Sequence, residues 1–443
     1  MDDPTPPAPT PPSDDIPAAR AVPTEDIEYP IAIPVLPPGA EPPPVMPAPP
    51  LQEVHTSWTV LRFFLLGVVG VAAYVTLLCI PGKTQDFASN GLTVIPFAGL
   101  ALVAYTADRY EAGRLLTVLY WVFLVGLIGL AFLAFGFIQA IDTAQFENLQ
   151  AGRPAGGNLF RPEGARALAL CVLGIAAGGL IGLLGFTRPV RRFFATLTPM
   201  DSDSFVHGTA LATVLAVTLV MFTPLAVFNE PPLLAALRRP EMAKLSNHDL
   251  RLDQMYAFAW MLPGAIVAVG FPVVRPLRGA LSRVGLVRPT TGQAVFALVA
   301  GAAFVGLMSV INLYIGDVWR WMGWPETSEK EFGQFMKSAI NPIGAIVIGA
   351  TAGLGEELIF RGVLQPRMGI LLANLLFTAM HAAQYNFDAL LSVFIVGLLL
   401  GIVRKYSNTT TSAVIHGLYD FILIRMAYAD FSLEMWLRQH AGI

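Results

Sequence analysis

Long apolar segments dominate this chain, and they restrict what it can fold into more than any other feature. Hydrophobic residues make up 55% of its 443 residues and charged residues only 13%, whereas a soluble domain usually carries about 25% charged residues. A helix that crosses a bilayer needs roughly 20 predominantly apolar residues. The sequence therefore predicts an all-α, polytopic membrane helix bundle with about eleven transmembrane helices, at residues 58–81, 91–107, 115–140, 166–187, 205–228, 255–274, 291–316, 339–360, 367–385, 387–403 and 409–428.

The first 56 residues have a different character. They contain 18 of the 35 prolines, and nine acidic residues against a single base, Arg20. Proline at that density prevents regular helices and sheets, and the segment has too few apolar residues to form a core. We expect residues 1–56 to be a disordered, acidic, proline-rich tail.

The basic residues between the apolar segments predict how the chain is oriented in the membrane. Arginine and lysine gather in five short connections, which alternate with longer segments of mixed charge: 108–114, 188–203, 275–290, 361–367 and 404–405. Cytoplasmic loops carry an excess of these two residues. We therefore expect the N-terminus in the cytoplasm and the C-terminus on the opposite side. The formal net charge of −3 gives no indication of a nucleic-acid partner.

Ionisable residues within the predicted spans are concentrated near the C-terminus. The first seven spans have no Asp, Glu, Lys or Arg in their interiors, whereas the last four hold Glu356, Glu357, Arg361, His381, His416 and Asp420. A charge at the centre of a bilayer costs at least about 2.5–3.5 kcal/mol, so a charged residue there indicates a functional site. This part of the chain is where we expect the chemistry.

The spacing of the acidic residues predicts different roles for two adjacent glutamates. Glu357 and Arg361 are four residues apart, so on a helix they share a face and can form an ion pair. Glu356 points about 100° away from Glu357. It has no helical partner of opposite charge and is the carboxylate available for chemistry.

The two histidines lie in short patterns of their own. Phe377 precedes His381 by one helical turn and can fix its packing. His416 and Asp420 share a helix face, so Asp420 could orient the His416 imidazole. Gly417 lacks a side chain and leaves room beside His416 for a backbone or a substrate.

A structural interpretation of these residues is also available. Membrane carboxylates and histidines can lock helices together in a polar network, or line a proton pathway. For any one residue alone, a structural role is the better explanation. An unpaired glutamate and two histidines on three separate helices favour catalysis.

Three of these patterns together are similar to a known family. Glu-Glu-x-x-x-Arg at 356–361, Phe-x-x-x-His at 377–381 and His-x-x-x-Asp at 416–420 resemble the motifs of the CAAX-protease and bacteriocin-processing family (CPBP, or Abi) of intramembrane endopeptidases. The resemblance covers roughly residues 339–428. It implies a catalytic membrane core at 339–430, preceded by a membrane region of unassigned role at 57–338 and followed by a short tail at 431–443.

The resemblance also implies how the site would act. Glu356 would activate a water molecule that attacks a peptide carbonyl, and His381 would share that water. His416 would stabilise the oxyanion, helped by residue 420, while Glu357 and Arg361 would brace the site. The substrate would be a membrane-embedded peptide or a lipidated protein, with prenylated CAAX proteins as the class that the family name suggests.

Asp420 departs from the family pattern, which usually has asparagine at this position. An asparagine amide can donate a hydrogen bond to an oxyanion, whereas an ionised aspartate repels it. Two explanations remain open: Asp420 is held protonated by burial, or it acts on His416 and not on the substrate.

A metal mechanism is the alternative to glutamate-activated water. Glu356, His381 and His416 could serve as zinc ligands. The chain has no His-Glu-x-x-His motif, however, and Glu357 is expected to be occupied by Arg361. We therefore expect a site that works without a metal or other cofactor.

Two functions other than proteolysis use the same class of fold. A transporter would need repeats with polar groups in both halves, and the uncharged upstream spans argue against it. A non-catalytic membrane scaffold or immunity factor is the stronger alternative, because it requires only the fold. Substitution of Glu356 and His381 distinguishes it from an enzyme.

Overall fold

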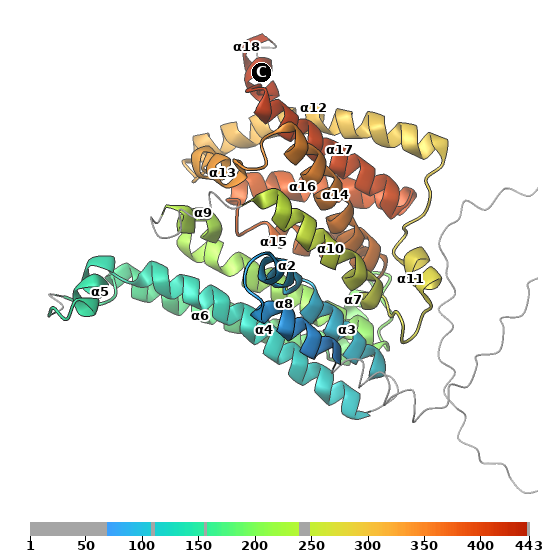
Figure 1. Cartoon of the computed structure of the whole chain (residues 1–443), viewed down its shortest axis with the longest axis horizontal. Coiled ribbons are helices and arrows are strands. Elements are labelled where there is room, and N and C mark those ends of the chain that lie inside the picture. The colour runs from blue at the N-terminus through green and yellow to red at the C-terminus, as the bar shows by residue number, and fades with distance from the viewer. Residues whose placement is uncertain (1–68, 108–110, 155–156, 239–248, 441–443) are drawn as a thin grey trace, which may run out of the picture. The chain divides into compact units, whose positions relative to one another are not determined.

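The computed structural model describes residues 69–107, 111–154, 157–238 and 249–440, which belong to one compact unit (Figure 1). These residues form helices and connections, and the one β-type pairing among them is an isolated bridge between Ile141 and Phe160. The all-α class is thus confirmed. The predicted tail at 1–56 lies outside the described residues.

Six described helices are long and apolar enough to cross a membrane: Glu111–Ala140, Glu163–Leu184, Phe205–Phe228, Thr291–Met322, Pro342–Met380 and Phe387–Tyr406. A seventh span is possible if α2 (Lys83–Gly91) and α3 (Ile95–Thr106), which meet at 43°, cross together. An integral membrane protein follows from these lengths and compositions. The count of about eleven spans stays a prediction, and residues 58–68 of its first span, 58–81, lie outside the described residues.

Two predicted spans, 339–360 and 367–385, form one helical stretch of 39 residues. It comprises α14 (Pro342–Glu357), the π-helix η2 (Leu358–Leu364) and α15 (Gln365–Met380). At 1.5 Å per residue this stretch would be about 58 Å long if straight, roughly twice the hydrocarbon thickness. Gly369 breaks it, with φ 71° and ψ 174°, a conformation essentially restricted to glycine. The sequence predicted a turn at 361–367, a few residues too early.

Asparagine caps define where the helices of the C-terminal part begin. The Asn341 side chain accepts hydrogen bonds from the backbone of Ile343 and Gly344 at the start of α14. Asn386 caps α16 (Phe387–Tyr406), and Asn408 caps α17 (Thr409–Tyr428). Each cap satisfies backbone N–H groups that the first helical turn leaves without partners. The caps therefore fix where each of the three helices begins.

Glycines allow these helices to approach closely. A Cβ atom on Gly353 would lie 2.6 Å from the Gly417 Cα, and one on Gly417 would overlap the Gly349 carbonyl oxygen. The space beside His416 is thus filled by the backbone of α14, so the first of the two expectations for Gly417, room for a backbone, is confirmed. The contact between α15 and α16 also depends on glycines. A Cβ atom on Gly397 would overlap the Asn374 side chain, and one on Gly401 would lie 2.8 Å from the Ile370 side chain.

The earlier helices pack around this group. They are α4 (Glu111–Ala140), α6 (Pro162–Leu184), α8 (Phe205–Phe228), α10 (Leu250–Ala268) and α12 (Thr291–Met322). Leu211 and Val214 of α8 share a buried cluster with Met368 and Leu372 of α15. The helices before residue 338 therefore help to position the site helices, and the predicted domain boundary at 338/339 stays a prediction.

Short helices occupy the connections, and Figure 1 shows α11 at one end of the bundle and α9 and α13 at the other. These helices are α5 (Thr143–Gln150), α7 (Arg188–Ala195), α9 (Pro232–Leu237), α11 (Leu277–Arg283), α13 (Glu329–Met336) and α18 (Leu433–His440).

Candidate functional site

A fully buried ion pair lies where α14 becomes η2. Glu357 is 0% exposed and Arg361 is 1% exposed. The Arg361 Nη1 atom is 3.2 Å from Glu357 Oε1, as the four-residue spacing predicted. Glu357 also accepts hydrogen bonds from the Ser412 hydroxyl, at 2.5 Å, and from His416 Nδ1, at 3.0 Å. The neutralised carboxylate thus ties α14 to α17.

Arg361 in turn ties η2 to the next two helices. Its Nη2 atom donates to the Gly397 carbonyl at 3.0 Å, and its guanidinium lies over the Phe377 ring, 4.3 Å from the centroid. One turn further on, Gln365 donates to the Gly401 carbonyl at 2.8 Å. Sequence reasoning missed these contacts and the one to Ser412. The matched four-residue spacings, Arg361 to Gln365 and Gly397 to Gly401, were the available signal.

Glu356 lies on a different face of the same helix turn. Its side chain is 22% exposed, and its Oε2 atom is 3.9 Å from the Nε2 of His381 and 4.0 Å from the Nε2 of His416. The Glu356 carboxylate forms no hydrogen bond with any described residue. It is therefore the polar group at which the two histidines converge.

The His381 imidazole is held by its neighbours in the chain. Its Nδ1 atom is 2.9 Å from the Phe377 carbonyl oxygen, and because a carbonyl can only accept, Nδ1 carries the hydrogen. Nε2, which faces Glu356, is then an acceptor in the neutral ring. The Phe377 ring contacts the imidazole edge to face at 4.8 Å, and Tyr385 stacks on its other side. The predicted aromatic support for His381 is present.

The orientation of His416 has a different cause from the one predicted. Glu357, and not Asp420, binds its Nδ1 atom. Asp420 lies on the other side, with Oδ2 3.6 Å from Nε2, which is beyond hydrogen-bonding distance. Sequence reasoning missed Glu357 because it assigned that carboxylate to Arg361 alone. Which of the two proposed roles Asp420 has stays a prediction.

The helices that carry these groups match a protein-family model over residues 338–422, and its description is type II CAAX prenyl endopeptidase Rce1-like. This part of the chain is an Rce1-like domain. The resemblance carried by the three motifs is thus confirmed, and at the level of the family the domain is of the CAAX protease type. Comparison of the chain with curated proteins and with solved structures found no match.

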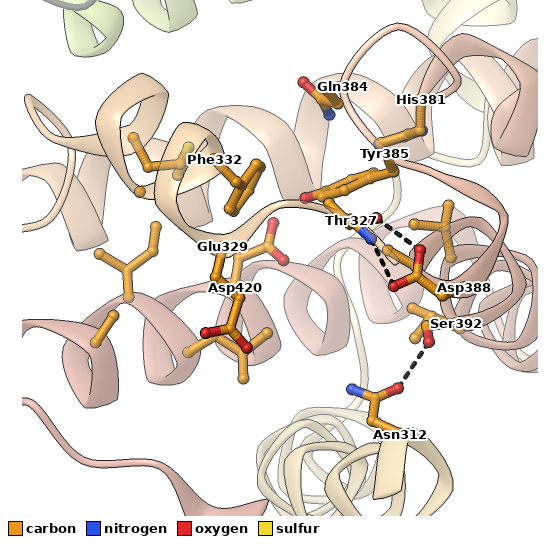
Figure 2. Close-up of a pocket in the computed structure, with 18 of the residues that line it drawn as sticks. Asn312, Thr327, Glu329, Phe332, His381, Gln384, Tyr385, Asp388, Ser392 and Asp420 are labelled. Carbon is orange, nitrogen blue, oxygen red and sulfur yellow. Dashed lines mark hydrogen bonds between the residues drawn. The ribbon is translucent and has the colours of Figure 1, made fainter. Parts of the chain in front are cut away.

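A cavity of about 840 Å³ opens onto the Rce1-like domain. Glu356, His381, His416 and Asp420 line it, whereas Glu357 and Arg361 do not. Figure 2 shows that its wall also includes residues from before the domain, with Asn312 of α12 and Phe332 of α13. The four predicted catalytic residues therefore share one cavity, and the two predicted bracing residues are packed outside it.

Hydrogen bonds hold the cavity wall together (Figure 2). Ser392 donates to Asn312 at 2.7 Å, and the Asn312 amide donates to Glu434 of α18 at 3.1 Å. The Thr327 backbone and hydroxyl donate to Asp388 at 2.9 and 2.7 Å. Burial raises the pKa of Glu434, which lies beyond the last span. Helices outside the domain thus complete the cavity. The motifs lie within 339–428 and could not predict this contribution.

The zinc alternative requires three side chains gathered around one point. Among the described residues, no group of three or more His, Cys, Asp and Glu side chains is arranged to hold a metal ion. Both histidines bond Nδ1 to other partners and direct Nε2 toward Glu356, an arrangement that is also usual for metal-ligating histidines. A site that works without a metal therefore stays a prediction, and we derive no step through a metal.

Proposed function

We propose that the chain is an intramembrane endopeptidase that hydrolyses a peptide bond of a membrane-associated substrate. The observation that carries this proposal is the convergence of Glu356, His381 and His416 at a cavity, with each Nε2 about 4 Å from one carboxylate oxygen. The family match supports the protease class. The mechanism below rests on the positions of this chain's own residues.

A water molecule fits between Glu356 and His381. Their atoms are 3.9 Å apart, which is too long for a hydrogen bond, and one water at about 2.8 Å from each can bridge them. Glu356 would accept one proton from this water, and the neutral Nε2 of His381 would accept its other hydrogen bond. The activated oxygen would then add to the scissile carbonyl carbon.

His416 would stabilise the oxyanion that forms. Because its Nδ1 hydrogen is directed to Glu357, it can donate from Nε2 only as an imidazolium. The Glu357 and Asp420 carboxylates supply the opposite charge on either side of the ring. When the intermediate collapses, Glu356 would transfer its proton to the departing amine, so that the carboxylate is regenerated.

Two features bear on the substrate. Glu356 lies in the stretch Pro342–Met380, which is long and apolar enough to cross the membrane, so the substrate segment would itself reach into the bilayer. The family description suggests a lipidated protein of the prenylated CAAX type. We keep the broader class, a membrane-embedded peptide or lipidated protein, as the proposed partner.

Cleavage of a fluorogenic membrane peptide by the reconstituted full chain tests the proposal. We expect His381→Ala and Glu356→Ala to lose cleavage, whereas Glu147→Gln, an exposed position on α5, retains it. Equal cleavage by all variants would rule out this site. A cellular phenotype that survives in both site variants would support the alternative function, a non-catalytic membrane scaffold.

A further inference from the structure

The two ends of the helix bundle differ in composition. At one end, which we call the basic end, the connections at 275–290 and 404–408 contact η2 and the stretch that leads to Gly369. Arg283 donates to the Gly362 carbonyl, and Arg404 donates to the Arg361 carbonyl. At the other end, which we call the mouth, α9 contacts the segment that follows His381 through a hydrogen bond from Leu233 to Ala383. Figure 1 shows α11 and α13 at these opposite ends.

The cavity belongs to the mouth. Its lining includes residues from α13, α18 and the connections near 326 and 385, but none from the connections of the basic end. Glu356 is 14 residues after Pro342, so it lies about 21 Å along α14 from the mouth. The cavity therefore reaches from the mouth to the site.

The route from the site to the basic end is closed. Beyond Glu356 and His416 lies the network of Glu357, Arg361 and Ser412, each at most 1% exposed. At the edge of this network, the Gly397 carbonyl accepts a hydrogen bond from Arg361 and the Gly401 carbonyl accepts one from Gln365. Within the part of the chain that the structure describes, the cavity thus leads to Glu356 from the mouth and not from the basic end.

The basic residues indicate which side of the membrane each end faces. Segments 111–114, 188–204, 275–290, 362–369 and 404–408, at the basic end, hold eleven Arg and Lys against three acids. Segments 229–238, 249–253, 317–338, 381–388 and 429–440, around the mouth, hold six against ten. Four of those six, Arg238, Arg251, Arg320 and Arg438, are in ion pairs. An excess of arginine and lysine marks the cytoplasmic side.

We propose that the cavity opens on the non-cytoplasmic side of the membrane, so that the site takes peptide segments that emerge on that side. The direction of the cavity stands on geometry and charge alone. The statement about the substrate rests on the proposed endopeptidase function. A lipidated C-terminus held at the cytoplasmic surface could not reach Glu356, so the substrate class narrows to exported or outward-facing membrane peptides.

Two matched cysteine substitutions test the direction. Both natural cysteines, Cys79 and Cys171, are free and are first replaced by serine and alanine. Ser432→Cys then reports on the mouth, and Ser282→Cys on the basic end, since both serines are exposed. A membrane-impermeant maleimide is added to right-side-out and to inside-out vesicles, and labelling is normalised to that in denaturant.

We expect Ser432→Cys to be labelled at least tenfold faster in right-side-out vesicles, and Ser282→Cys at least tenfold faster in inside-out vesicles. The reverse pattern, or equal labelling in both preparations, would overturn the proposal. So would a Ser432→Cys thiol that reacts only in denaturant. If the cysteine-free chain fails to fold, antibody binding to a tag after α18 of the natural chain reports the same side.

An activity measurement separates this proposal from the proposed function. If the site is a protease, a bulky maleimide on Ser432→Cys should slow cleavage in right-side-out vesicles, and the same reagent on Ser282→Cys should not. Absence of cleavage in the unmodified protein would refute the endopeptidase function and leave the labelling result intact. Cleavage that is blocked only by modification at Ser282→Cys would refute the direction.

Discussion

Two faces of one helix turn carry adjacent glutamates in contrasting surroundings. Glu357 is fully buried and has three partners, Arg361, Ser412 and His416. Glu356 faces the cavity, accepts no hydrogen bond from a described residue, and has only histidine nitrogens near 4 Å. The comparison teaches that partners, and not residue type, decide which carboxylate can take up a proton during a reaction. A satisfied carboxylate stabilises the fold, and an unsatisfied one can act on water.

The largest expected effect is on catalysis at Glu356. Glu356→Gln keeps the size of the side chain but removes the base, so we expect the cleavage rate to fall by about 10²–10⁴-fold. Because Glu356 holds no structural partner, the unfolding temperature in detergent should change little. Side-by-side cleavage and thermal unfolding measurements check this split. A large loss of stability with little loss of activity would reverse the roles of the two glutamates.

The buried pair should show the opposite split. Glu357→Gln leaves Arg361 without its charge partner inside the protein, so we expect a loss of about 3–5 kcal/mol in unfolding free energy. Replacing both, as Glu357→Leu with Arg361→Met, should recover part of that stability, since no lone charge remains. Activity should stay low in the double variant because His416 has lost its Nδ1 partner. Denaturant unfolding of the single and double variants measures the difference, and a double variant as unstable as the single one would contradict this account.

The same contrast explains how far the sequence alone could lead. The four-residue spacing of Glu357 and Arg361 is a local property, so their ion pair was predictable. Ser412 and the Asn312 wall come from distant segments, and no local pattern encodes that they meet the site. The contact of Arg361 with the Gly397 carbonyl had only the matched four-residue spacings as a signal. The turn at Gly369 was displaced from the predicted position because the π-helix continues the chain past Arg361. The motifs thus located the candidate site. The partners that distinguish Glu356 from Glu357 could be identified only from the packed helices.

A smaller effect is expected at Asp420, where the cavity face meets His416. Asp420→Asn preserves a polar group 3.6 Å from Nε2 and matches the residue that the family pattern usually has. We expect the cleavage rate to stay within about tenfold of the natural chain, because Glu357 keeps the His416 ring in place. Asp420→Ala, which removes both donor and acceptor, should be slower than Asp420→Asn. A rate for Asp420→Asn as low as that of Glu356→Gln would mean that the negative charge at 420 is required for His416 to act.

The smallest effect is expected from metal chelation. This experiment tests whether Glu356 acts on water directly or through a bound metal ion. A catalytic zinc needs three protein ligands with one position left for water, and no described group of His, Cys, Asp and Glu supplies them. A strong chelator should therefore leave cleavage unchanged, measured on the same preparation before and after dialysis. Activity that is lost on chelation and restored by zinc would show that Glu356 and the two histidines move together around an ion. The distances of about 4 Å from Glu356 Oε2 to the two histidine Nε2 atoms would then be those between ligands of one metal ion, and not those between groups bridged by a water molecule.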